Sequence, residues 1–490
     1  VGSAMQALAG ALVDAGRAEE AVGLYREALA MVRRFFGDDS PHELGILHNL
    51  GSALADRGQF AEAEQCLQQA LALAQQSYGP VHTEVATCLD TLATLLSETG
   101  SHQAAAALVR QSMAMQRQLL GPTHFGVATA ANNLSVVLGK LGDFAGSEAA
   151  AREALAILAA TVGKDVPIGA KATLNLAIAL NQQQRLAEGA RLLQEVMPQL
   201  ARHFGDPSVT LASAWNSLGC ALRDLGRHAE AAPCLQKAVA MARQCFPAGH
   251  PSVATSLENL GTLFEAQGDH AGAEAAFREG LQVMTQVLGA DHPNCASMLV
   301  NLAHVSLAQQ SFDAAEGFAR RAVGLLASSP DDPVRMEAMS RLAQALARKG
   351  AAAEAGDCYR EAIAIHRRLR PQGDTQFAIT LLQFGVFLIQ QQHAGDAEPL
   401  LRESLQIFAR LDPEGVDQYA IMGQLGGALV EQGKFTDAEP LLLEALTKRP
   451  REDAARQRAI AWLVRIYEAL DKPEAAAVWR GKLAQPKAGQ

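Results

Sequence analysis

Four histidines have the spacing that first suggests chemistry. His82, His124, His250 and His292 lie 42 residues, or three times 42 residues, apart. Imidazole is a common ligand of metal ions, so a row of histidines raises the question of a metal site. Copies at one fixed spacing occupy equivalent positions in successive units, however, and do not surround a single ion. We therefore predict that these histidines are structural linker residues, and that the protein binds no metal and no cofactor.

The cysteines and the missing catalytic motifs indicate a protein without an active site. Seven cysteines with no C-x-x-C pair imply neither a disulfide framework nor a zinc ribbon. They occur at small or apolar helical positions, where buried, unreactive thiols are expected. The sequence contains no phosphate-binding G-x-x-x-x-G-K-[ST], no H-E-x-x-H and no G-x-S-x-G. We therefore predict no enzyme activity, and the unpaired thiols predict a cytoplasmic location.

Charge and composition exclude three further classes of protein. The 490 residues include 42 Lys and Arg against 52 Asp and Glu, a net charge of −10. This balance is opposite to that of a nucleic-acid-binding surface. No apolar run approaches the ~18 residues that cross a membrane. Hydrophobic residues make up 49% of the chain, which excludes a disordered protein, and only 5% are aromatic, which predicts a core of Ala, Leu and Val. Neither nucleic acid nor membrane is therefore expected as a partner.

A repeat of 42 residues organises the chain into units. A leucine such as Leu50 stands eight residues before most turns, and a small residue such as Ala63 stands five residues after them. A repeated position with a large apolar side chain before the turn, followed by one with a small side chain after it, predicts two helices that cross closely. The turns themselves are marked by a residue that is usually glycine, with a slight drift in phase near the end: Gly16, Gly58, Gly100, Gly142, Gln184, Gly226, Gly268, Gln310, Gly350, Gln392 and Gly433.

One unit illustrates the elements that carry these columns. Leu47, Leu50 and Leu54 recur at spacings of three and four, which is typical of an amphipathic helix. Gly58 ends this helix, because glycine tolerates the left-handed conformation that follows a helix C-terminus. A second helix is expected over residues 59–77, before a Gly-Pro pair. No alternating strand pattern occurs, so the predicted fold class is all-α.

The columns together resemble the tetratricopeptide repeat family over nearly the whole chain. The first helix of a unit has a bulky residue such as Trp215 and a small one such as Gly219, and the second helix has alanines such as Ala231 and Ala238. The usual repeat has 34 residues, and the 42-residue variant is similar to that of kinesin light chains. The resemblance implies a right-handed superhelical solenoid of about 12 helical hairpins, with one concave surface lined by the first helices.

The drift in phase predicts a division of this array. Repeats one to eight are expected over residues 1–327, repeats nine to twelve with a C-terminal cap over residues 335–484, and a polar tail over residues 485–490. Residues 328–334 lie between the two sets and include Pro333, which disfavours helical geometry before it. We predict an irregular linker there, with a change in superhelical pitch.

Polar residues are predicted to line the concave surface. Asparagine recurs in the column nine residues before the turn, and other polar residues occupy the neighbouring columns. An Asn side chain both donates and accepts hydrogen bonds, which suits the backbone of an extended peptide. The alternative is that these side chains are solvated, or bond a neighbouring helix and stiffen the stack. The predicted peptide-binding residues are Asn49, Asp90, Asn132, Asn133, Lys171, Asn175, Asn216, Asn259, Asn301 and Arg341.

Two functions implied by the resemblance can be compared residue by residue. Some tetratricopeptide domains bind the C-terminal carboxylate of chaperones through two Lys, two Asn and one Arg. Asn133 and Lys171 match that pattern, but Asp90, Thr94 and Asn175 stand where Lys, Asn and Arg are required. Kinesin light chains bind acidic cargo peptides through basic residues, whereas the polar columns here are mixed in sign. The sequence therefore specifies neither function.

Three functions remain open on the sequence alone. The first is a non-enzymatic scaffold that binds an extended peptide or protein segment along the concave surface. The second is the sensor or regulatory arm of a larger protein, because bacterial repeats of this type often adjoin caspase-like protease domains or nucleotide-binding switch domains. The third is self-association through the terminal repeats, which gives a structural assembly. We expect the first, with a protein or peptide as the partner.

Overall fold

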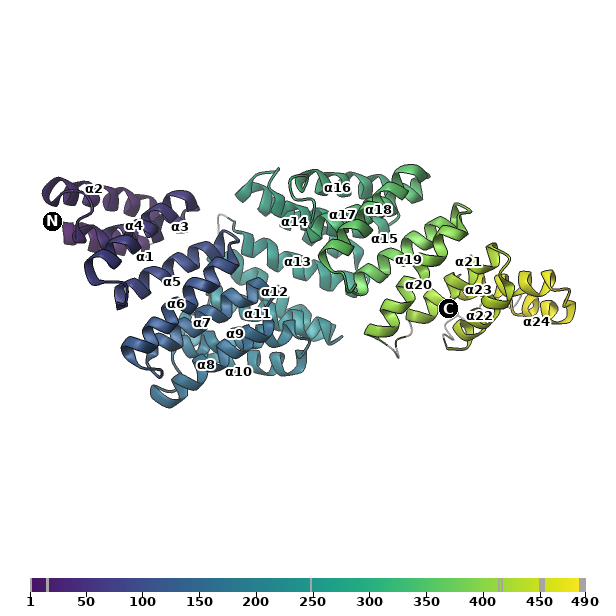
Figure 1. Ribbon diagram of the computed structural model, residues 1–490, viewed down its shortest axis with the longest axis horizontal. Coiled ribbons are helices and arrows are strands. Elements are labelled where there is room, and N and C mark those ends of the chain that lie inside the picture. Colours follow the sequence, from purple (N-terminus) through teal and green to yellow (C-terminus); the bar gives the residue numbers. More distant parts are fainter. Residues whose placement is uncertain are drawn as a thin grey trace. The chain divides into compact units, whose positions relative to one another are not determined.

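Paired helices account for nearly all of the chain. The computed structural model describes residues 2–14, 17–246, 249–412, 415, 417–448 and 454–483. Within those ranges the regular structure consists of α-helices and two short 3₁₀ helices, without a strand, and Figure 1 shows the helices following one another in pairs. The predicted all-α class is therefore confirmed. Gly16 and residues 485–490, where the sequence predicts a turn and a tail, lie outside the described residues.

The chain divides into two compact units, Val1–Ala248 and Gly249–Gln490. The helices of the first unit are α1 (Gly2–Asp14), α2 (Ala18–Phe36), η1 (Pro41–Glu43), α3 (Leu44–Asp56), α4 (Phe60–Tyr78), α5 (Thr83–Glu98), α6 (His102–Leu120), α7 (Phe125–Leu141), α8 (Phe144–Thr161), α9 (Pro167–Gln182), α10 (Leu186–Phe204), α11 (Val209–Asp224) and α12 (His228–Cys245). Those of the second unit are α13 (Pro251–Ala266), α14 (His270–Leu288), η2 (Pro293–Cys295), α15 (Ala296–Ala308), α16 (Phe312–Leu325), α17 (Pro333–Lys349), α18 (Ala352–Leu369), α19 (Thr375–Gln390), α20 (Ala394–Leu411), α21 (Asp417–Glu431), α22 (Phe435–Lys448), α23 (Ala454–Ala469) and α24 (Pro473–Leu483).

The segment between α16 and α17 contains the predicted linker. Helix α16 ends at Leu325, and α17 begins at Pro333 with Asp332 as its N-cap. Proline is favoured at the first position of a helix, where its missing N–H has no intrahelical partner to lose. Residues 326–332 are irregular, whereas Pro333 and Val334, which the sequence assigns to the linker, belong to α17. The division of the repeats and the change in pitch at residues 328–334 stay predictions.

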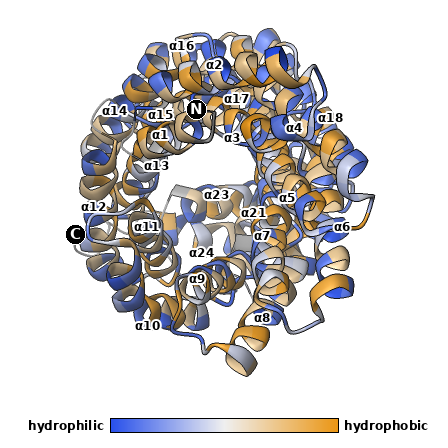
Figure 2. Ribbon diagram, turned by 90° about the vertical axis from the view of Figure 1, so that its left-hand side faces the viewer, coloured by the Kyte–Doolittle hydropathy of each residue, from blue (hydrophilic) through white to orange (hydrophobic). Residues whose placement is uncertain are grey.

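Two layers of helices make up each unit. Each odd-numbered helix packs against the even-numbered helix that follows it, and within a unit that even-numbered helix also contacts the next odd-numbered one. In Figure 2 helices α5, α7 and α9 of the first unit lie along one side, and α6, α8 and α10 cover the other. Helices α13, α15 and α17 have the same relation to α14, α16 and α18 in the second unit. We call the side of the odd-numbered helices that is turned away from the even-numbered ones the first-helix face of each unit.

Glycines on the odd-numbered helices permit the close crossing that the columns predict. A Cβ atom built on Gly261 of α13 would lie 2.5 Å from the ring of Phe277 on α14, and one on Gly219 of α11 would lie 2.5 Å from Leu235 on α12. Phe277 and Leu235 are both completely buried. Because carbon atoms pack best at about 3.5–4.0 Å, any larger residue at these two positions would force the helices apart.

Left-handed turns follow the odd-numbered helices even where glycine is missing. Gly142 has a φ of +85° and Gly350 a φ of +83°. Gln184, Gln310 and Gln392 occupy the same turn with φ values of +63°, +61° and +63°. The repeat geometry is thus kept at these three positions at the cost of steric strain, because a Cβ atom crowds the carbonyl in this conformation.

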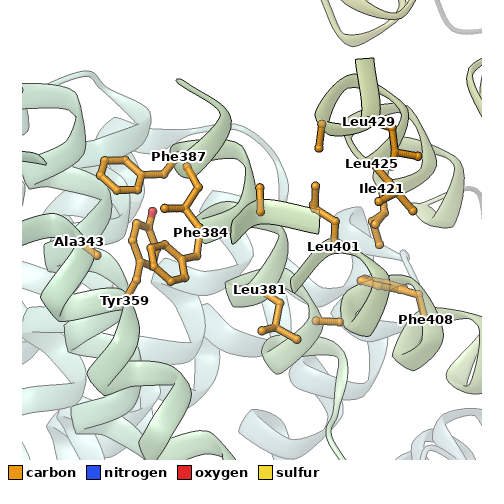
Figure 3. Close-up of a cluster of buried hydrophobic side chains, with 14 of the residues drawn as sticks. Ala343, Tyr359, Leu381, Phe384, Phe387, Leu401, Phe408, Ile421, Leu425 and Leu429 are labelled. Carbon is orange, nitrogen blue, oxygen red and sulfur yellow. The ribbon is translucent and has the colours of Figure 1, made fainter. Parts of the chain in front are cut away.

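Alanine and aliphatic side chains form most of the core, as the composition predicts. Alanines at the helix crossings, such as Ala63 and Ala438, are completely buried. The second unit also has an aromatic cluster (Figure 3): the ring of Tyr359 on α18 lies with its centroid 5.1 Å from that of Phe384 and 5.8 Å from that of Phe387, both on α19. This packing holds the odd-numbered helices in register with their partners and so positions the polar side chains on the first-helix face.

Candidate functional site

All ten predicted binding residues lie on odd-numbered helices. Asn49 and Lys171 are exposed and Asn132 is buried, while the other seven are half-buried. In the first unit the residues are Asn49 on α3, Asp90 on α5, Asn132 and Asn133 on α7, Lys171 and Asn175 on α9, and Asn216 on α11; in the second unit they are Asn259 on α13, Asn301 on α15 and Arg341 on α17. The columns read from the sequence therefore fall on the predicted helices.

Hydrogen bonds link polar side chains of successive odd-numbered helices. The amide of Asn175 donates to Oδ1 of Asn132 at 2.9 Å, and the amide of Asn301 donates to Oε1 of Glu258 at 2.9 Å. Each pair is 43 residues apart, one residue more than the repeat. In the second unit Gln344 also donates to Gln383 at 3.0 Å. These side chains thus bond neighbouring helices, which was one of the two interpretations open from the sequence.

Two carboxylates on these helices have no cationic partner among the described residues. Asp90 accepts a hydrogen bond from the amide of Gln116 at 3.1 Å, but its Oδ1 atom is buried and has no hydrogen-bond partner in the described part of the chain. Burial raises the pKa of Asp90 to about 6. Burial also raises the pKa of Glu258, and repulsion from Glu337 adds to the rise. Within the part of the chain that the structure describes, neither Asp90 nor Glu258 forms an ion pair, so each keeps an uncompensated negative charge when it is ionised.

Two cations lie on the same face of their units. The Nε atom of Arg341 is buried and finds no hydrogen-bond partner among the residues that the structure describes. Burial lowers the pKa of the Arg341 guanidinium, although Glu337 and Glu265 oppose that shift. Lys171 places its Nζ atom 5.0 Å from the ring centroid of Phe204, within the range of a cation–π contact. The first-helix face is therefore mixed in sign, which agrees with the expectation from the sequence.

The repeat columns match known sequence profiles over most of the chain. Three profiles, all described as tetratricopeptide repeat, match it: one at residues 42–118, 170–244 and 252–328, one at residues 216–286, and one at residues 1–42, 127–167, 335–371 and 420–451. The chain belongs to the tetratricopeptide repeat family. No curated protein matches it.

Two solved structures with similar repeats each match less than half of this tetratricopeptide repeat protein. A single-residue variant of a candidate kinesin light chain with nearly identical TPR-like repeats, from Podosopora anserina, has 24% identity and covers 41% of this chain and 94% of its own, with a TM-score of 0.37. BtubC (BKLC) from P. vanneervenii has 22% identity and covers 48% of this chain and 92% of its own, with a TM-score of 0.38.

The repeated histidines cap the tetratricopeptide helices. Nδ1 of His82 accepts a hydrogen bond from the backbone N–H of Glu84 at 3.2 Å, and Nδ1 of His124 accepts one from Gly126 at 3.0 Å. His250 and His292 make the same contact two residues ahead, as the N-caps of α13 and η2. Their predicted structural role in the linkers is therefore confirmed. Among the described residues, no three or more His, Cys, Asp or Glu side chains come together in a way that could hold a metal ion.

The cysteines and the helix lengths bear on two further expectations. Burial raises the pKa of the Cys88 and Cys358 thiols to about 11, so both are protonated at neutral pH. This agrees with the predicted burial of these two thiols, whereas Cys220 and Cys245 are only half-buried. Among the described helices, none combines the length and the apolar character needed to cross a bilayer.

Ion pairs between even-numbered helices were not foreseen from the sequence. Arg26 contacts Glu62 at 2.7 Å, and Arg367 contacts Glu403 at 2.7 Å. Both pairs are 36 residues apart, and this offset between basic and acidic residues is the signal that could have revealed them. Exposed pairs of this kind contribute about 0–1 kcal/mol each. They join neighbouring tetratricopeptide repeats on the side opposite the first-helix face.

Proposed function

We propose that this chain is a non-enzymatic scaffold that binds an extended segment of a protein partner along the first-helix face. Proteins built from tetratricopeptide repeats generally bind other proteins, and the family profiles cover most of this chain. The observation that carries the proposal is that Asp90 on the first-helix face of the first unit, and Glu258 and Arg341 on that of the second unit, are partly or largely desolvated without an ion-pair partner among the described residues. Such groups gain most from a partner that supplies the missing charge.

The asparagines supply the less specific part of this binding. Asn49 and Asn133 make no side-chain hydrogen bond within the described part of the chain, so both amides are available to a peptide backbone. Asn175 uses one donor on Asn132, and a side-chain amide has a second donor and an acceptor oxygen in reserve. Because each such bond contributes ~1 kcal/mol net, several of them in succession hold an extended segment without requiring one particular sequence.

A cytoplasmic location belongs to the same proposal. Five of the seven cysteines are buried and all seven are unpaired. Unpaired thiols persist in a reducing compartment and are oxidised or paired in secreted proteins. The proposed scaffold therefore acts on a cytoplasmic protein.

The test is a double variant in the first unit, Asn49→Ala with Asn133→Ala. Both changes remove an amide from the first-helix face and leave the hydrogen bonds between repeats intact. Loss of two bonds of ~1 kcal/mol each weakens binding by roughly 10- to 30-fold. Tagged wild-type protein is used to capture proteins from the source lysate, and the double variant is expected to retain each captured protein at least tenfold less.

The matched control is Gln69→Ala with Gln111→Ala, two exposed amides on the even-numbered helices α4 and α6. It is expected to retain the same proteins as the wild type. Circular dichroism verifies that both double variants are folded. Equal capture by the two double variants would contradict the proposed function.

A further inference from the structure

A cavity of about 320 Å³ opens beside the first-helix face of the second unit. It lies between α13, α15 and α17, and the linkers that precede α15 and α17 contribute to its wall. Thr255 and Ser297, which line it, occupy the polar column one helical turn before the predicted asparagines. The cavity is therefore adjacent to the proposed binding residues of this unit. Its volume is near the lower end of the range for ligand sites, about 300–1,000 Å³, and is large enough to admit a long side chain.

The floor of the cavity is apolar and contains two thioethers. Met284 of α14 and Met298 of α15 line it and are 7% and 2% exposed, together with the buried side chain of Leu326. Methionine is unbranched and polarisable, and it adapts its shape to whatever packs against it. Such a floor accommodates the aliphatic stem of a long side chain but does not by itself fix the charge of the group at its end.

The charge of the occupant follows from the wall. Glu258 and Asp332 line the cavity, and no lining residue that the structure describes is basic. Glu258 already interacts with the amide of Asn301 and the hydroxyl of Ser297, and Asp332 uses one carboxylate oxygen to accept the N–H of Val334 at 2.7 Å. Each carboxylate therefore has an oxygen that can accept a further hydrogen bond. No described cation in the cavity compensates either charge, and a cationic ligand would supply that compensation.

We propose that this cavity binds an arginine side chain of the partner segment. The aliphatic stem lies on Met284 and Met298, and the guanidinium donates to Glu258 and Asp332 from different edges. Arginine fits this arrangement because its planar head carries five N–H donors and is less strongly hydrated than an ammonium group. This inference rests on the proposed function, since the arginine is part of the segment held along the first-helix face.

The sequence columns alone could not reveal this site. Met284 and Met298 come from an even-numbered and an odd-numbered helix and occupy positions that usually serve the core. Asp332 belongs to the linker where the spacing of repeats shortens, and Glu258 replaces the asparagine that stands at Asn216 one period earlier. Asp332 is the N-cap of α17, whereas histidines cap α13 and η2, so a change of residue type at the cap places a second carboxylate in the cavity.

The test is a titration of the whole chain labelled with ¹³C at the methionine methyl groups. The probe is Nα-acetyl-arginine methylamide, and the neutral isostere is the corresponding citrulline compound. We expect the arginine probe to shift the Met284 and Met298 methyl signals saturably at millimolar concentration, and the citrulline probe to bind at least tenfold more weakly. The lysine compound is expected to bind between these two. Equal binding of the arginine and citrulline probes, or equal shifts at all methionines, would overturn the assignment.

Variants without the two negative charges test whether Glu258 and Asp332 bind the arginine probe. Glu258→Gln and Asp332→Asn each keep a hydrogen-bond acceptor. Each is expected to lower the affinity for the arginine probe at least fivefold, because a charge-assisted hydrogen bond becomes a neutral one. Glu444→Gln removes an exposed carboxylate on α22 and is the matched control, with unchanged affinity expected. If neither Glu258→Gln nor Asp332→Asn weakens the probe, the cavity is not an arginine site.

The outcome is distinguishable from failure of the proposed function. If the Asn49 and Asn133 double variant loses its captured proteins while the arginine probe fails to bind, the cavity assignment alone is wrong. If the arginine probe binds as expected while that double variant captures proteins normally, the cavity assignment stands and the proposed use of the first-helix face is wrong.

Discussion

Replacing the three left-handed glutamines with glycine is expected to stabilise the protein. Gln184, Gln310 and Gln392 stand in turns where most repeats have glycine, at φ values of +61° to +63°. Their side chains are exposed and make no hydrogen bond in the described part of the chain. Substitution by glycine therefore removes steric strain and loses no tertiary contact.

The magnitude follows from two opposing terms. The left-handed conformation costs a residue with a Cβ atom ~1–2 kcal/mol. Glycine loses more conformational freedom on folding than other residues, which costs about 0.5–1 kcal/mol. The net expectation is a gain of roughly 0.5–1 kcal/mol for each substitution. Because the three turns are in different repeats, the gains are expected to add when Gln184, Gln310 and Gln392 are changed together.

Urea denaturation followed by circular dichroism measures the effect. Each single variant is expected to raise the midpoint, and the triple variant to raise it further. The matched control is Gln391→Gly, one residue before Gln392, where φ is −84° and glycine brings only the entropic cost. That control is expected to lower the midpoint. If Gln392→Gly lowers the midpoint as much as Gln391→Gly does, the strain argument is refuted.

Three further perturbations test the packing, the caps and the buried charge. Gly261→Ala is expected to destabilise the second unit by about 1–3 kcal/mol, since its Cβ would overlap the buried ring of Phe277. The control is Gly317→Ala, whose Cβ would meet no described atom within 4 Å and which is expected to stabilise the protein. Thermal denaturation measures both effects. His82→Ala is expected to cost ~1 kcal/mol through loss of the N-cap acceptor, whereas His82→Asn keeps it, and urea midpoints distinguish the two. The pKa of Asp90 is raised from 3.8 to about 6 in the folded state, so its ionisation lowers the stability of the protein as the pH rises from about 4 to 6. Asp90→Asn is therefore expected to be more stable than the wild type at pH 7 but not at pH 4. Equal urea midpoints of the two proteins at pH 7 would contradict this.

The fold was predictable because the same pattern of apolar and small residues recurs in successive repeats. One amphipathic helix around Leu50 does not specify a fold by itself. Two crossing helices follow from the recurrence of a leucine eight residues before most turns and a small residue five residues after them. The crossing itself depends on single atoms, as Gly261 against Phe277 illustrates. The turn at Gln184 shows the same dominance of context, because packing of the two helices keeps the left-handed geometry without glycine.

The candidate site was predictable only in part. The columns placed the polar residues on odd-numbered helices, but they could not tell which side chains bond a neighbouring repeat. The bond between Asn175 and Asn132 joins residues 43 apart, so the period of 42 residues does not identify this pair. The cavity beside Glu258 needed the three-dimensional arrangement, because its methionine floor and Asp332 come from different columns.

The most direct measurement of the central claim is site-specific photo-crosslinking in lysate. A benzophenone amino acid is placed at Asn49, Asn133 or Lys171 on the first-helix face, and at Gln69 or Gln111 on the opposite side. Binding along the first-helix face predicts that the first three positions form covalent adducts with the same partner segment, and that the last two form none. Adducts that arise equally on both sides, or only at Gln69 and Gln111, would contradict the account.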